Sequence, residues 1–136
     1  MRWIIAIVAT LILAGPAFAT DYDIAPYAGV PTQYTLQSGG TSVANGHTLN
    51  FSGAAATVGC VVAWGSTTTT GAITFETAGS ASYTGAWAPL GTVTWGAASS
   101  QVSFALSQYG LRAFRARIST ASDGNGVTVT CTGQAR

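Results

Sequence analysis

The side chains that could perform acid–base chemistry are few and scattered. The chain contains four acidic residues and one histidine, with no lysine. General acid–base catalysis needs two titratable groups held close together. A serine nucleophile needs a histidine base oriented by a carboxylate. His47 lies in the turn-like sequence NGHT, far in sequence from Glu76 and Asp123, so we expect no catalytic residues and no enzymatic activity.

Metal ligation has equally little support in the sequence. Asp123 and Asn125 could offer oxygen ligands, but Ca²⁺ needs about six to eight, and SDGNG is a typical hairpin-turn sequence. Two cysteines and His47, without local clustering, do not supply the usual four ligands of a structural zinc site. We therefore expect neither a metal nor another cofactor.

Binding chemistry is better represented, by aromatic and arginine side chains. Tyr83 and Trp87 lie in a Gly-, Ser- and Ala-rich stretch, residues 77–88, which we expect to be a long loop. Aromatic rings beside guanidinium groups can stack on a sugar or grip a partner's carboxylates. We therefore name Tyr83, Trp87, Arg115 and Arg117 as candidate binding residues. The alternative is that Trp87 and Trp95 fill the core, since large aromatic residues are mostly buried.

The two arginines belong to the segment LRAFRARI, residues 111–118, which holds three of the five basic residues. A strand places alternate residues on opposite faces, so the apolar residues at 114, 116 and 118 face the core while Arg115 and Arg117 face outward. Arg112 is in phase with the core set, so the strand should begin after it. The alternative to a binding patch is a solvated face with Glu76 or Asp123 as cross-strand partner. Replacing both outward arginines with Ser should then leave folding nearly intact.

The two cysteines share the apolar faces of their predicted strands. Cys131 alternates in phase with Val127 and Val129, and Cys60 in phase with Val58 and Val62. An even number of cysteines in an exported protein indicates a disulfide, and we expect this one inside the core. Closing so long a loop would stabilise the fold by about 4 kcal/mol. Apolar residues on both faces of the run around Cys60 further predict a strand covered on both sides.

The N-terminal segment predicts export. Arg2 precedes an apolar run over residues 3–14 and the sequence AFA at 17–19, so we expect a signal peptide over residues 1–19. The run is short for a membrane span of about 20 residues, although an uncleaved anchor is the alternative. We expect a secreted, periplasmic or cell-surface protein with no membrane contact after signal removal.

Charge is unusually sparse. Charged residues make up 7% of the chain, against roughly 25% in ordinary soluble domains. Beyond residue 19 the chain contains four arginines and four acidic residues, so the net charge of this part is zero. Nucleic-acid binders are normally basic, so we expect no nucleic acid. A neutral, charge-poor surface instead favours self-assembly or packing against protein partners.

Short runs separated by turn residues predict the fold. Residues 20–31 contain two prolines and indicate an extended arm. Residues 32–136 hold eight apolar or alternating runs, and no helical stripe is evident. The pattern predicts an all-β, antiparallel two-sheet sandwich, jelly-roll-like, with about eight strands. The runs are Gln33–Leu36, Thr48–Phe51, Thr57–Trp64, Ala72–Glu76, Leu90–Trp95, Gln101–Leu106, Ala113–Ser119 and Val127–Thr132.

Four segments together carry a family resemblance. They are GAITFET (71–77), SYTGAWAPLGTV (82–93), YGLRAFRARIST (109–120) and GVTVTCTG (126–133). This succession resembles the small jelly-roll-like β-sandwich domains of bacteriophage virion proteins. Those have a TVTFE strand, a dG-W-x-x-L segment, a YxRxRV strand and a terminal GTVTVT strand. The signal peptide and the cysteine pair depart from that pattern. The resemblance implies a non-enzymatic structural or attachment module, in which Trp87 and the arginine pair recur for the fold as much as for a ligand.

Two functions follow from these observations. We expect an exported, non-enzymatic β-sandwich that acts through protein–protein contacts as a structural or adhesion module, virion-associated or at a cell surface. The alternative is a secreted carbohydrate-binding module, with Trp87, Tyr83 and the two outward arginines at the sugar.

Overall fold

The computed structural model describes residues 21–24, 32–53, 55–65, 67–96 and 100–135. The predicted signal peptide and most of the predicted arm lie outside these ranges. Nine strands and no helix are present within them. No helix capable of crossing a membrane therefore occurs in the part of the chain that the structure describes.

All eight predicted runs form strands, and residues 22–24 add a ninth. The strands are β1 (Tyr22–Ile24), β2 (Thr32–Gly40), β3 (Ala44–Phe51), β4 (Ala55–Trp64), β5 (Gly71–Ala78), β6 (Ala88–Trp95), β7 (Ser100–Tyr109), β8 (Ala113–Thr120) and β9 (Val127–Ala135).

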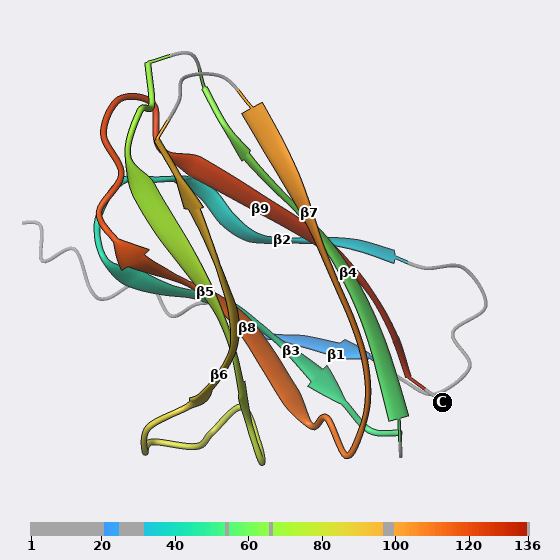
Figure 1. Cartoon of the computed structure of the whole chain (residues 1–136). Coiled ribbons are helices and arrows are strands. Elements are labelled where there is room, and N and C mark those ends of the chain that lie inside the picture. The colour runs from blue at the N-terminus through green and yellow to red at the C-terminus, as the bar shows by residue number, and fades with distance from the viewer. Residues whose placement is uncertain (1–20, 25–31, 54, 66, 97–99, 136) are drawn as a thin grey trace, which may run out of the picture.

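The strands form two sheets that pack as a sandwich (Figure 1). Sheet A has the order β1-β3-β8-β5-β6, and sheet B has the order β2-β9-β4-β7. From β2 onward, consecutive strands alternate between the sheets except at the β5–β6 hairpin, which is the winding of a jelly roll. The predicted antiparallel sandwich is confirmed, with one correction: β1 pairs in parallel with β3.

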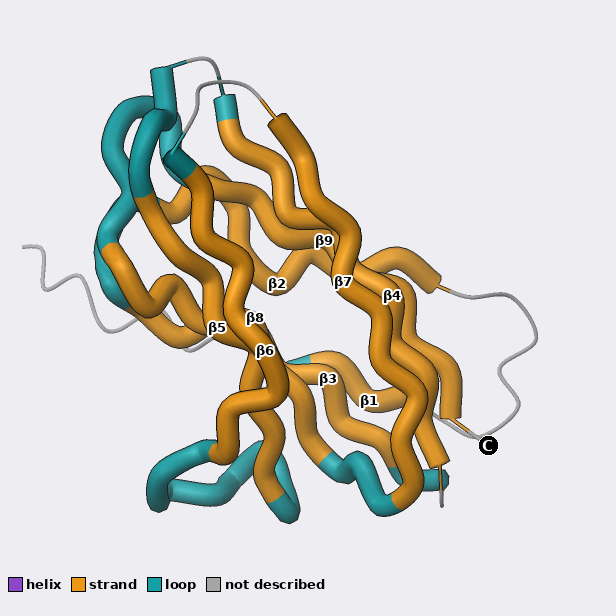
Figure 2. Tube along the Cα trace, viewed as in Figure 1, coloured by secondary structure: helices purple, strands orange, loops and turns teal. Residues whose placement is uncertain are grey.

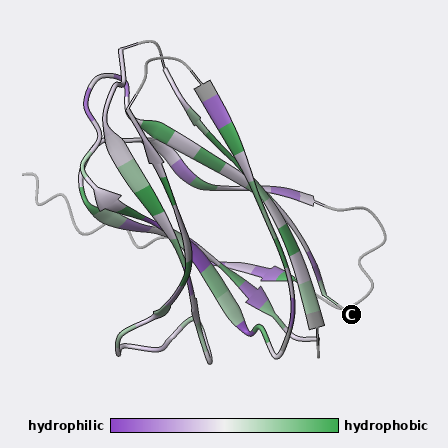
Figure 3. Cartoon of the chain, in the orientation of Figure 1, coloured by the Kyte–Doolittle hydropathy of each residue, from purple (hydrophilic) through white to green (hydrophobic). Residues whose placement is uncertain are grey.

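The period of two explains which residues enter the core. Along β9, Val127, Val129 and Cys131 are buried while the threonines between them face outward, and hydrophobic and neutral bands alternate along this strand (Figure 3). Along β8, the apolar residues from 114 to 118 are buried, as predicted. Burying one face of each strand supplies the main free energy that holds the sheets together.

Aromatic rings fill the space between the sheets. Phe75 stacks on Phe104 with ring centroids 4.2 Å apart, and Phe114 lies beside both rings. Trp64 stacks on Trp95 at 4.9 Å. The interpretation that Trp95 fills the core is therefore confirmed.

The disulfide lies in sheet B, as a bridge between neighbouring strands. Cys60 of β4 stands directly opposite Cys131 of β9, their sulfurs are bonded, and both residues are buried. The predicted core disulfide is confirmed. β4 is interior to sheet B, but its outer face is not covered: Val61 is 40% exposed. The expectation that both faces of this strand are covered is therefore wrong, because no further layer packs on sheet B in the described chain.

Loops and turns gather at the two ends of the strands (Figure 2). The loop between β5 and β6 is the longest of those fully described and lies at the same end of the sandwich as the β7–β8 turn. That end carries most of the candidate binding residues.

Candidate functional site

A largely buried ion pair joins the neighbouring strands β5 and β8 on the outer face of sheet A. The register places Glu76 of β5 directly opposite Arg115 of β8, and both residues are in the outward phase of their strands. Arg115 Nη2 lies 2.7 Å from Glu76 Oε2, and its Nε donates to the same oxygen at 2.8 Å. Hydrogen-bonded ion pairs of this kind are stronger than neutral hydrogen bonds.

The β5–β6 loop covers this ion pair. Trp87 places its ring over the Arg115 guanidinium, 4.1 Å from centroid to Cζ, and its Nε1 donates to the backbone carbonyl of Tyr83 at 3.2 Å. Only 8% of Trp87 is exposed, yet it lies outside the cluster of core residues between the sheets. The interpretation that Trp87 fills the sandwich core is therefore wrong: it is buried against the outer face of sheet A instead.

The two outward arginines have different environments. The Arg115 side chain is 16% exposed, whereas that of Arg117 is 39% exposed, with its Nη1 3.8 Å from Glu76 Oε1. The predicted outward phase is confirmed for both. The expected cross-strand partner Glu76 is confirmed for Arg115. The expectation of a solvated side chain holds for Arg117 but not for Arg115, because Glu76 lies at the edge of the Arg115 guanidinium and Trp87 covers its face.

The structure thus brings three of the four candidate binding residues together. Arg115 and Arg117 both lie against Glu76, Trp87 covers Arg115, and Tyr83 adds a backbone carbonyl while its side chain stays exposed. Arg117 and the Tyr83 ring are the members of this group left accessible to a partner.

Asp123, the other cross-strand partner considered for the arginines, binds the segment before β5 instead. Its carboxylate accepts hydrogen bonds from the Thr69 hydroxyl at 2.6 Å and from the backbone N–H groups of Thr69 and Thr70 at 2.7 and 3.0 Å. These bonds, led by that of the Thr69 hydroxyl, lower the pKa of Asp123 below its ordinary value. Asp123 thereby joins the β8–β9 turn to the segment before β5. Among the described residues, no three His, Cys, Asp or Glu side chains are grouped so that they could hold a metal ion.

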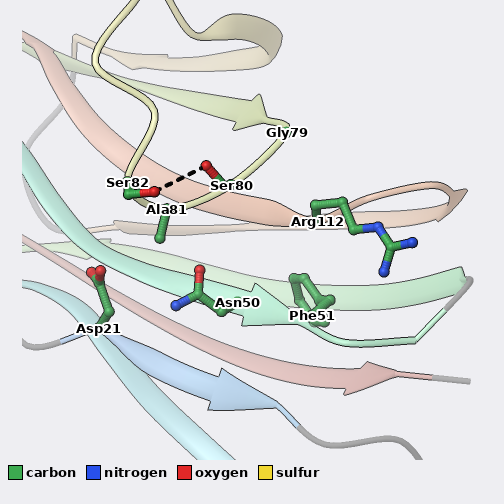
Figure 4. A pocket seen from close by; sticks show the side chains of 8 residues that line it. All are labelled: Asp21, Asn50, Phe51, Gly79, Ser80, Ala81, Ser82 and Arg112. Carbon is green, nitrogen blue, oxygen red and sulfur yellow. Dashed lines mark hydrogen bonds between the residues drawn. The ribbon is translucent and has the colours of Figure 1, made fainter.

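An open pocket, which the sequence pattern did not indicate, lies between β3 and the β5–β6 loop. It has a volume of about 460 Å³ and is lined by Asp21, Asn50, Phe51, Arg112 and the loop residues 79–82 (Figure 4). Its polar groups already have partners. Asp21 accepts a hydrogen bond from the Thr48 backbone N–H, and the Asn50 side-chain amide donates to the Asp23 carboxylate. Arg112 donates to the Gly53 carbonyl at 3.1 Å.

Sheet B differs from sheet A in its chemistry. None of its four strands contains Asp, Glu, Lys or Arg, whereas strands of sheet A carry Asp23, Glu76, Arg115 and Arg117. The outward residues of β4, β7 and β9, which we call the sheet B outer face, are small or β-branched apart from glutamines. They are Thr57, Gly59, Val61 and Ala63 of β4, Gln101, Ser103, Ala105 and Ser107 of β7, and Thr128, Thr130, Thr132 and Gln134 of β9.

Comparison of the chain with protein-family models, with curated proteins and with solved structures finds no match.

Proposed function

We propose that this chain is an exported, non-enzymatic structural or adhesion module that works through protein–protein contacts. The observation that supports this most strongly is the sheet B outer face, which joins three neighbouring strands without one charged side chain. The resemblance to the β-sandwich modules of phage virion proteins agrees with the proposal. We therefore infer a place for the chain on a virion or a cell surface.

The composition of that face suits contact with another protein. Burying a charged group without a partner costs several kcal/mol, and the cores of protein interfaces are depleted in charged residues. Val61, 40% exposed near the middle of β4, supplies apolar area, while the threonines and serines beside it supply hydroxyl groups for hydrogen bonds. A partner can therefore approach this face closely at a small desolvation cost.

Carbohydrate binding is the second candidate, and the pocket with Asp21, Asn50 and Arg112 in its lining is the observation that favours it. Carboxylate, amide and guanidinium groups can together recognise sugar hydroxyls. Trp87 offers less to a sugar than an open platform would, because Arg115 lies against its ring and little of it is exposed. Because so little of Trp87 is available to a sugar, we rank protein contacts above carbohydrate binding.

Site-directed photo-crosslinking in the producing cells distinguishes the two functions. A photoreactive amino acid replaces Val61 on the sheet B outer face or, as the matched control, Thr94, an exposed residue in the outward phase of β6 in sheet A. We expect protein adducts from position 61 and far fewer from position 94. Equal adducts from both positions, or none from position 61 together with specific glycan binding that Asn50→Ala abolishes, would refute the proposal.

A further inference from the structure

The four edge strands of the sandwich are protected to very different degrees. The strand orders leave β1 and β6 at the edges of sheet A, and β2 and β7 at the edges of sheet B. An edge strand presents unpaired backbone N–H and C=O groups that can pair with another chain. Proteins usually prevent this with short strands, bulges, prolines or charges.

Three of these edges carry such a device. β1 has only three residues. β2 has two register shifts against β9, on either side of Gln37. β6 contains Pro89 and has a register shift against β5 next to it. Each of the three therefore presents a short or irregular row of backbone groups.

β7 carries none of them. It pairs with β4 residue for residue, from Ser100 opposite Trp64 to Tyr109 opposite Ala55, without a register shift. Its sequence, SQVSFALSQY, contains no charged residue, no proline and no glycine. Its core-facing side chains are also incompletely covered: Val102 is 39% exposed, and Phe104 and Leu106 are half-buried. This edge is long, regular and neutral, and its three successive inward positions 102, 104 and 106 are apolar.

We propose that β7 pairs antiparallel with β7 of a second copy of this chain, about a two-fold axis, so that two four-stranded B sheets join into one. This inference rests on the proposed function: β7 borders the sheet B outer face, and the second copy is the protein partner that we propose at this edge. A two-fold interface places the same patch on both copies. A second copy of β7 is a suitable occupant because it is equally regular and brings no charge to the edge.

The side-chain alternation limits the register to those that pair inward residues with inward residues, and the register centred on Phe104 pairs all three inward apolar residues of β7 with one another. That register places Phe104 opposite the second copy's Phe104, and Val102 opposite the second copy's Leu106. Aromatic and aliphatic cross-strand pairs of this kind stabilise a sheet. In the same register, Ser103 on the outer face stands opposite the second copy's Ala105, so no outward pair is bulky or charged.

Two matched substitutions test the interface. Val102→Lys places a charge on the inner side of β7, whereas Val61→Lys places the same charge, at nearly the same exposure, on the neighbouring strand. Light scattering coupled to size exclusion should show dimers for the full-length, disulfide-bonded wild type and for Val61→Lys. For Val102→Lys the dimer should dissociate at least about tenfold more readily. All three proteins retain residues 1–20, so association through that segment affects them equally.

A charge exchange tests the register with exposed residues that folding does not require. Ser103→Lys combined with Ala105→Lys places like charges opposite each other across the axis, whereas Ser103→Lys combined with Ala105→Glu places opposite charges there. We expect the first pair to give monomers and the second to give dimers. Identical behaviour of the two would overturn the register. A monomeric wild type up to about 1 mM, or equal weakening by Val61→Lys and Val102→Lys, would overturn the interface. The proposed function would survive these results if position 61 still gave protein adducts.

Discussion

Replacing Arg115 with Ala should lower the free energy of unfolding by about 3 kcal/mol. Removing one partner of a buried ion pair typically costs about 3–5 kcal/mol, because the other charge is left without compensation. Two features reduce this cost: the residual exposure of Arg115 and the presence of Arg117 Nη1, 3.8 Å from Glu76. Loss of the guanidinium beneath Trp87 adds about 1 kcal/mol.

Arg117→Ala is the matched control, because it removes the same group from the same face of the same strand. Its side chain is more than a third exposed, and exposed ion pairs contribute at most about 1 kcal/mol. Equilibrium unfolding in urea, followed by far-ultraviolet circular dichroism, measures both losses. A loss for Arg115→Ala no larger than that for Arg117→Ala would refute the assignment of Arg115 to a buried cluster.

The double Ser variant of these arginines separates what the sequence predicts from what the structure predicts. The alternation in LRAFRARI alone predicts nearly intact folding. With Arg115 held between Glu76 and Trp87, we instead expect a loss of stability at least as large as that of Arg115→Ala.

Three other perturbations have expected outcomes. Reducing the disulfide, or replacing Cys60 and Cys131 with Ala, should lower the free energy of unfolding by about 4 kcal/mol, since it closes a loop with a sequence separation of 71; an unchanged melting temperature in reductant would contradict this. The pKa of Asp123 lies below 3.8 in the folded chain, so its hydrogen bonds stabilise the fold above about pH 4 and are lost as the pH falls further. Asp123→Asn should therefore flatten the acid side of a plot of urea midpoint against pH, and an unaltered slope would argue against this role. Gly126→Ala should cost more than about 1 kcal/mol, because φ is +78° and the new Cβ would lie 2.5 Å from a backbone oxygen. Gly79→Ala, where no atom lies within 4 Å, should be nearly neutral by the same assay.

The strands could be predicted from the sequence because alternation is a local property. In β8 and β9 the apolar phase is unbroken, so the faces and the burial of Cys131 followed directly. β1 was missed because it has three residues in a proline-containing segment and forms a strand only by pairing with β3. That pairing depends on a segment more than 20 residues away, which no local period reveals.

The candidate site could be predicted only in part, for the same reason. The outward phase of Arg115 follows from the strand pattern, which left Glu76 and Asp123 as its two possible cross-strand partners, and the register of the sheet decides for Glu76. The covering by Trp87 does not, because it depends on the path of a glycine-rich loop. The pocket was missed entirely because Asp21, Asn50 and Arg112 come from three segments that the topology alone brings together.

The position of the disulfide also determines how the chain responds to a pulling force. Tension applied at the two termini would run through Cys60 and Cys131, so the covalent bond would carry it past the residues between them. Those residues correspond to a separation of 71, or about 240 Å of extended chain, which could not be drawn out until the bond is reduced. An oxidised molecule would therefore lengthen only through the segments outside the bridge, a response that suits the structural or adhesion role proposed above.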